Sequence, residues 1–94
     1  MTDQERNDIP GGVPSMFSQL VMMFATSALQ QMGKIANPFT GKVDEPHLDA
    51  AQATIDMLDM LEEKTRGNLS DEEKKHLDGT LYDLRMRYVS TAGM

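Results

Sequence analysis

Residues 70–89 read SDEEKKHLDGTLYDLRMRYV, and this stretch indicates the fold more clearly than any other part of the chain. Ser70 and Glu73 form a capping box, in which the serine hydroxyl accepts from the Glu73 amide and the Glu73 carboxylate accepts from the Ser70 amide. Apolar residues then recur on one face at helical spacing, at Leu77, Leu81, Leu84 and Tyr88. The stretch predicts a helix over residues 71–89, with a frayed C-terminus at residues 91–94.

An earlier helix is predicted over residues 16–32. Ser15 is a suitable N-cap, and Gly33 can adopt the positive φ that often follows a helix C-terminus. Before this helix, residues 1–14 are polar, end in PGGVP and show no apolar period. We therefore interpret residues 1–14 as a disordered tail.

The middle helix is predicted over residues 46–66, because Pro46 is tolerated in a first helical turn and Gly67 can end the helix. Either Asp44 or Glu45 is expected to cap it. The preceding NPFTGKV segment has the proline and glycine of a turn-rich connector. Three helices of similar length, joined in this way, predict an all-α fold, a three-helix hairpin or bundle that forms one domain over residues 15–90.

Composition limits the classes of function. The chain has 94 residues and no cysteine, so neither disulfides nor thiolate metal sites can stabilise it. A net charge of −6 without a basic patch argues against nucleic-acid binding, because phosphate backbones would be repelled. The first residues lack the basic and apolar regions of a signal peptide, so we expect a cytoplasmic protein.

The first helix has more apolar surface than a small bundle can bury, since no residue from Ile9 to Gly33 is charged. One side is expected to fill the core, through Phe17, Leu20, Val21, Phe24 and Ala28. The other two helices also have second apolar faces. We expect homo-oligomerisation to complete the bundle, a dimer being favoured, through Met22, Met23, Leu29, Met32, Met57, Met60, Tyr82, Met86 and Val89. An equal alternative is that several methionines fill the core of the monomer instead, namely Met22, Met23, Met57, Met60 and Met86.

Polar motifs give little support for catalysis. Glu73 and His76 have the Glu-x-x-His spacing of some metal sites, but Glu73 already serves the capping box, which leaves His76 on a solvated flank. We therefore expect no metal, no cofactor and no catalytic residue. Arg85 and Arg87 are candidates for a specific polar contact. Compensation of the helix dipole and pairing with acids of the middle helix is the simpler interpretation of both.

Three motifs carry a resemblance to a known family: NPFTGKV at 37–43, TIDMLDMLEEKTRGNLSDEE at 54–73 and LYDLRMRYV at 81–89. In this order they resemble a bacterial family of small uncharacterised helical proteins, domain-of-unknown-function family eighteen forty-four. The resemblance extends from Phe17 to Val89. It implies an all-helical cytoplasmic protein, and it implies no activity, substrate or catalytic residue.

These patterns favour a non-enzymatic helical module that self-associates and docks an unidentified protein partner. The alternative, from a different class, is peripheral attachment to a membrane through the uncharged helix at 16–32. That helix lacks the basic flank typical of interfacial helices, and it is too polar to span a bilayer. We therefore expect a protein partner rather than a membrane.

Overall fold

The computed structural model describes residues 14–93, and over this range the chain forms three α-helices and no strand. Helix α2 comprises Met16–Gln31, α3 comprises Leu48–Lys64 and α4 comprises Asp71–Ala92. The predicted all-α class with three helices is confirmed. The predicted disordered tail at residues 1–14 lies outside the described residues, apart from Pro14.

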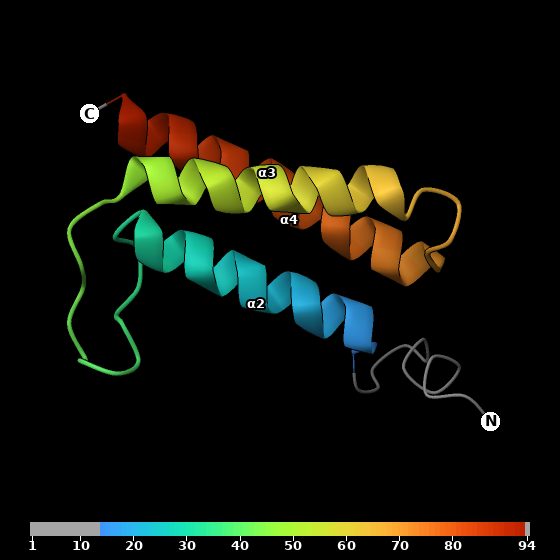
Figure 1. The fold of residues 1–94 in the computed structure, drawn as a ribbon, viewed down its shortest axis with the longest axis horizontal. Helices are drawn as coiled ribbons and strands as arrows, with labels where there is room; N and C mark the ends of the chain where they lie inside the picture. The colour runs from blue at the N-terminus through green and yellow to red at the C-terminus, as the bar shows by residue number, and fades with distance from the viewer. Residues whose placement is uncertain (1–13, 94) are drawn as a thin grey trace.

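Successive helices are antiparallel, so α2 and α4 run in the same direction and α3 runs against both (Figure 1). Each of the three helices contacts the other two. The long connector between α2 and α3 lies at one end of the bundle, together with the end of α4. The short turn between α3 and α4 lies at the opposite end, where α2 begins.

The core lies between the three helices, and each helix region supplies three buried apolar side chains to it. These are Val21, Ala28 and Met32 from α2 and its C-cap, Ala51, Ile55 and Leu58 from α3, and Leu77, Leu81 and Leu84 from α4. Burial of a leucine-sized side chain stabilises a fold by about 1.5–3 kcal/mol. Two of the nine residues are alanines, and partly buried side chains that include Phe17, Phe24 and Tyr88 pack against this core.

Both ends of α2 have the caps that the sequence predicts. The Oγ of Ser15 accepts from the Ser18 amide at 3.1 Å. At the other end Gly33 has a φ of 72°. The amides of Gly33 and Lys34 donate to carbonyls of the last turn, which is a Schellman motif. A Cβ at Gly33 would lie 3.0 Å from the Asp44 carbonyl oxygen, so glycine also allows the connector to approach closely.

The capping box of α4 is formed as predicted, with the Ser70 amide 2.9 Å from Glu73 Oε1 and the Glu73 amide 3.1 Å from Ser70 Oγ. The helix continues to Ala92, past the predicted end at 89. Thr91 is buried, and its hydroxyl donates to the Arg87 carbonyl. The prediction of fraying is therefore wrong for residues 91 and 92, because this last turn is not fully solvated.

The start of α3 also differs from the prediction. The helix begins at Leu48, and His47 is an N-cap whose side chain makes no capping hydrogen bond. The His47 amide donates to the carbonyl of Gln31 at the end of α2. Asp44 accepts from the side-chain amide of Asn37. A cap by Asp44 or Glu45 is therefore wrong, because the connector closes on itself and on α2 before the helix begins.

Within the connector, residues 36–43 form a tight loop, hereafter the 36–43 loop. Ala36 and Val43 form an antiparallel bridge, and the amide of Asn37 donates to the Lys42 carbonyl at 2.8 Å. The Oδ1 of Asn37 accepts from the Phe39 amide at 2.8 Å. Gly41, with a φ of 72°, donates its amide to the Asn37 carbonyl. The predicted turn-rich connector is thus an ordered loop that extends away from the helices (Figure 1).

Candidate functional site

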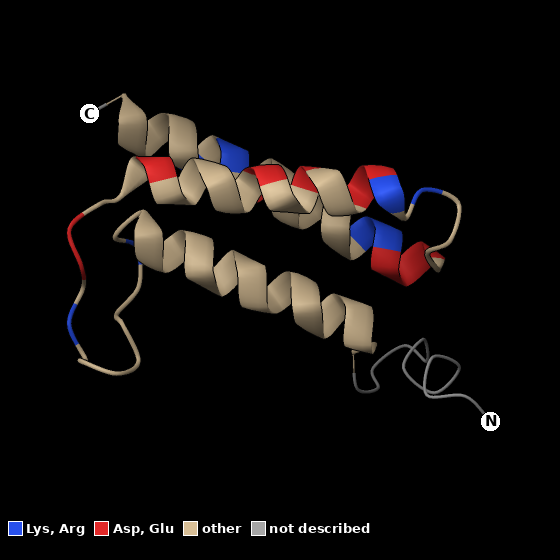
Figure 2. Cartoon of the chain, in the orientation of Figure 1, with Lys and Arg blue, Asp and Glu red and all other residues tan. Residues whose placement is uncertain are grey.

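Helix α2 exposes apolar side chains on the side that faces away from the core. Met16, Met22 and Met23 are all exposed. Leu20 was expected in the core but is 38 % exposed. It lies about 100° around the helix from Val21, which is fully buried. Leu20 therefore lies outside the side of α2 that faces the core. Figure 2 shows that no charged residue interrupts the surface of α2.

Two residues assigned to the second face of the first helix lie elsewhere. Met32 is only 1 % exposed, because it follows Ala28 by one helical turn and points to the same side. Its assignment to an interface is therefore wrong. Leu29 is half-buried and packs against the core, which leaves only its edge on the surface.

The second apolar faces of α3 and α4 are exposed, at Met57 and Met60 on α3 and at Tyr82, Met86 and Val89 on α4. The alternative that Met22, Met23, Met57, Met60 and Met86 fill the core of the monomer is therefore wrong. The apolar faces of α3 and α4 differ from that of α2 because charged residues lie beside them. Charged residues occur along both α3 and α4, as Figure 2 shows.

Arg85 and Arg87 are both engaged in ion pairs. Arg85 donates to the carboxylate of Asp59, which joins α4 to α3 as the simpler interpretation predicted. Arg87 instead pairs within α4, with its Nε 2.8 Å from Asp83 Oδ2. Compensation of the helix dipole is not supported, because α4 is longer than predicted and has no basic residue in its last turn.

A hollow of about 490 Å³ lies over the contact between α3 and α4. Its lining includes three carboxylates, at Asp59, Glu62 and Asp78. Each carboxylate already has a cation, because Asp59 pairs with Arg85, Glu62 with Arg66 at 2.7 Å, and Asp78 with Lys74 at 2.7 Å. The hydrogen bond from Arg66 lowers the pKa of the Glu62 carboxyl, and the bond to Asp78 raises the pKa of Lys74. The acidic side chains that line this hollow are therefore already neutralised by ion pairs within the chain.

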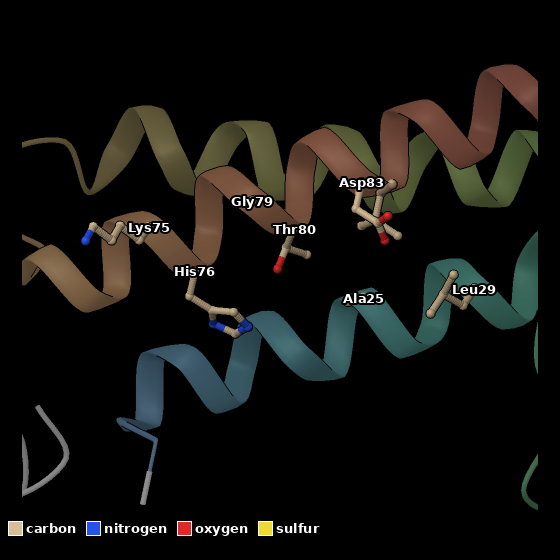
Figure 3. A pocket seen from close by; sticks show the side chains of 8 residues that line it. Ala25, Leu29, Lys75, His76, Gly79, Thr80 and Asp83 are labelled. Atoms are coloured by element: carbon tan, nitrogen blue, oxygen red, sulfur yellow. The ribbon is translucent and has the colours of Figure 1, made fainter. Parts of the chain in front are cut away.

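A second hollow, hereafter the α2/α4 groove, has a volume of about 330 Å³ and lies between α2 and α4 (Figure 3). It is lined by Ala25, Leu29, Lys75, His76, Gly79, Thr80, Asp83 and Leu84. The imidazole of His76 extends toward α2, and its Nδ1 is buried without a hydrogen-bond partner. The expectation of a solvated His76 is therefore wrong, because α4 presents this residue to α2.

The predicted Glu-x-x-His pair is not assembled into a larger cluster. Glu73 is buried within the capping box. Across residues 14–93, no group of three or more histidine, cysteine or acidic side chains is arranged to hold a metal ion. None of the described helices is long and apolar enough to cross a membrane.

Two features of the surface were not singled out from the sequence. The first is Phe39, which the 36–43 loop leaves 96 % exposed. The second is the α2/α4 groove. Gly79 was an available signal for the groove, because a glycine inside a helical pattern costs about 1 kcal/mol relative to alanine.

The comparison with known families agrees with the resemblance of the three motifs. The family model described as Domain of unknown function (DUF1844) matches residues 14–90, which include α2, α3 and nearly all of α4. No curated protein and no solved structure matches the chain. Since the family model covers most of the chain and all three motifs, the chain belongs to the DUF1844 family.

Proposed function

We propose that the protein is a non-enzymatic helical module that self-associates through the outward face of α2. The observation that carries the proposal is the uncharged surface of this helix, on which Met16, Met22 and Met23 are exposed while the opposite side already fills the core. Apolar surface of this kind, without charges among it, is typical of protein interfaces. The stripe of Tyr82, Met86 and Val89 on α4 is then free to dock a further protein.

A second copy of the chain is the simplest cover for this face. A small core leaves a short domain with a narrow margin of stability, and oligomerisation is a common way to widen it. Pairing about a two-fold axis covers the same patch on both copies at once. The interface would then add to the buried apolar area of each protomer without any change in the fold.

Sedimentation of the full chain tests this proposal. We expect wild type to form a dimer or higher oligomer at micromolar concentration. Met22→Glu with Met23→Glu should give a monomer of unchanged helicity, because these side chains are 46 % and 68 % exposed and do not support the core. The matched control is Met57→Glu with Met60→Glu, which adds the same charge at similar exposures, 48 % and 46 %, on α3. The control should remain associated.

Two results would contradict the proposal. One is a wild-type chain that stays monomeric up to about 100 μM, where even a weak contact near −6 kcal/mol would be visible. The other is equal loss of association in both double variants, which would mean that any added charge separates the copies. Flotation of wild type with anionic vesicles, abolished by the α2 substitutions alone, would assign the face to a membrane instead.

A further inference from the structure

We propose that the α2/α4 groove receives the side chain of Phe39 from the 36–43 loop of a second copy of the chain. This inference rests on the self-association proposed above and adds a second contact to the one through the outward face of α2. One copy contributes a projecting aromatic residue, and the other contributes the hollow between α2 and α4. A reciprocal pair of such contacts would relate the two copies by a two-fold axis.

The backbone at Phe39 is fixed by hydrogen bonds, whereas its side chain is almost fully exposed. Its side chain is 96 % exposed, at the tip of the most heavily hydrogen-bonded turn of the connector. Asn37 fixes this turn through its amide, its carbonyl and its side chain, and Thr40 Oγ1 accepts from the Lys42 amide at 3.2 Å. A preorganised loop loses little conformational entropy on binding. Aromatic side chains presented in this way are frequent energetic centres of interfaces.

The α2/α4 groove has the size and lining for an aromatic side chain. Its volume of about 330 Å³ lies at the lower end of the volumes of ligand pockets, and the hollow is open to solvent rather than enclosed. Apolar surface comes from Ala25 and Leu29 on α2, and the buried Leu84 of α4 also lines the hollow. Figure 3 shows the side of α4 that carries His76, Thr80 and Asp83 turned toward α2 across this space.

Gly79 keeps the groove open at its α4 side. A glycine inside a helix costs about 1 kcal/mol relative to alanine. A Cβ at Gly79 would meet no atom of the chain within 4 Å, so packing within the monomer does not require glycine there. The residue lines the groove, where a missing side chain leaves room for a neighbour.

The charges beside the two surfaces are complementary. On α4, Lys75 and Asp83 lie at either end of the groove lining, about 12 Å apart along the helix axis. The loop has Lys42 on one side of its closing bridge and the acidic pair at residues 44–45 on the other. With Phe39 in the groove, the acidic pair can approach Lys75, whereas Asp83 already pairs with Arg87. Such pairing fixes orientation more than it adds affinity.

A complementation experiment on the full chain tests the contact. Phe39→Ala removes the aromatic side chain, and Gly79→Leu fills the groove; each should weaken dimerisation at least tenfold. Neither should destabilise the monomer, because the Phe39 side chain is almost fully exposed and a Cβ at position 79 would meet open space. Ser90→Leu, also exposed on α4 but outside the groove, is the matched control and should associate like wild type.

The decisive step is to mix the two variants, one of them fluorescently labelled. A mixed dimer has one intact contact, since Phe39 of the Gly79→Leu copy meets the open groove of the Phe39→Ala copy. We expect the mixture to associate more tightly than either variant alone. Unchanged association in both single variants, or a mixture no tighter than its components, would overturn the contact. If those variants still dimerise but the α2 double-glutamate variant does not, self-association stands and only this contact fails. A monomeric wild type would contradict both proposals.

Discussion

Helices α2 and α4 contribute equally to the core but differ in how they face water. Each supplies three buried apolar residues, counting the C-cap of α2. On its other sides α4 has many charged residues, including the ion pairs of Lys74 with Asp78 and of Asp83 with Arg87. The outward side of α2 has methionines among uncharged polar residues. The buried apolar stripe therefore determines how a helix is oriented in the bundle. The charges on its outer side determine whether that side is suited to water or leaves apolar surface exposed.

The largest expected effect separates the inner stripe of α4 from the outer side of α2. Leu77→Ala should lower the free energy of unfolding by about 2–5 kcal/mol, because Leu77 is fully buried and its loss leaves a cavity. Met23→Ala should change it by less than about 0.5 kcal/mol at concentrations where the chain is monomeric. Urea denaturation measures both values. A Met23→Ala loss as large as that of Leu77→Ala would mean that the outer side of α2 packs within the monomer.

The next effect compares the first turns of the two helices. Ser70→Ala should cost about 1 kcal/mol, because the Glu73 amide loses its acceptor. Ser15→Ala should cost at least as much, because α2 has no acidic residue in its first turn whereas α4 has three. Thermal melts of the two variants give the order. A clearly larger loss for Ser70→Ala would show that coupling within the capping box matters more than the helix dipole.

The smallest effect concerns charge, and it cannot involve α2, which has no titratable side chain. Arg66 lowers the pKa of Glu62 below its ordinary value of 4.5. A carboxyl whose pKa is lowered by folding adds stability above that ordinary value and loses it as the pH falls through the folded pKa. Glu62→Gln should therefore lose less stability than wild type between pH 5 and pH 3, within the range expected of an exposed pair. Identical acid melts of the two proteins would show that the pair is not maintained in solution.

What the sequence predicted correctly depends on local geometry. Three caps were predicted correctly, at Ser15, Gly33 and Ser70. Each is formed by residues close together along the chain, so the spacing of residues in the sequence is sufficient to predict it. The leucine stripe of α4 was equally clear, because charged residues on the other sides leave only one direction for the core.

The remaining errors share a physical cause, which is that tertiary contacts decide them. An uncharged helix such as α2 gives no direction for its core, so Leu20 and Met32 were assigned to the wrong sides. The start of α3 depends on the contact between His47 and Gln31, which are far apart along the chain. Likewise, the α2/α4 groove exists only once α2 lies beside His76 and Gly79, and no spacing within α4 predicts that.

The odd number of helices has a practical consequence for attaching probes. The chain enters α2 at the end of the bundle that holds the α3–α4 turn, and it leaves α4 at the end that holds the 36–43 loop (Figure 1). A bulky tag joined after α4 would therefore be attached at the same end of the bundle as the 36–43 loop. The start of α2 lies at the opposite end of the bundle, so attachment ahead of α2 is the better choice for any measurement of assembly.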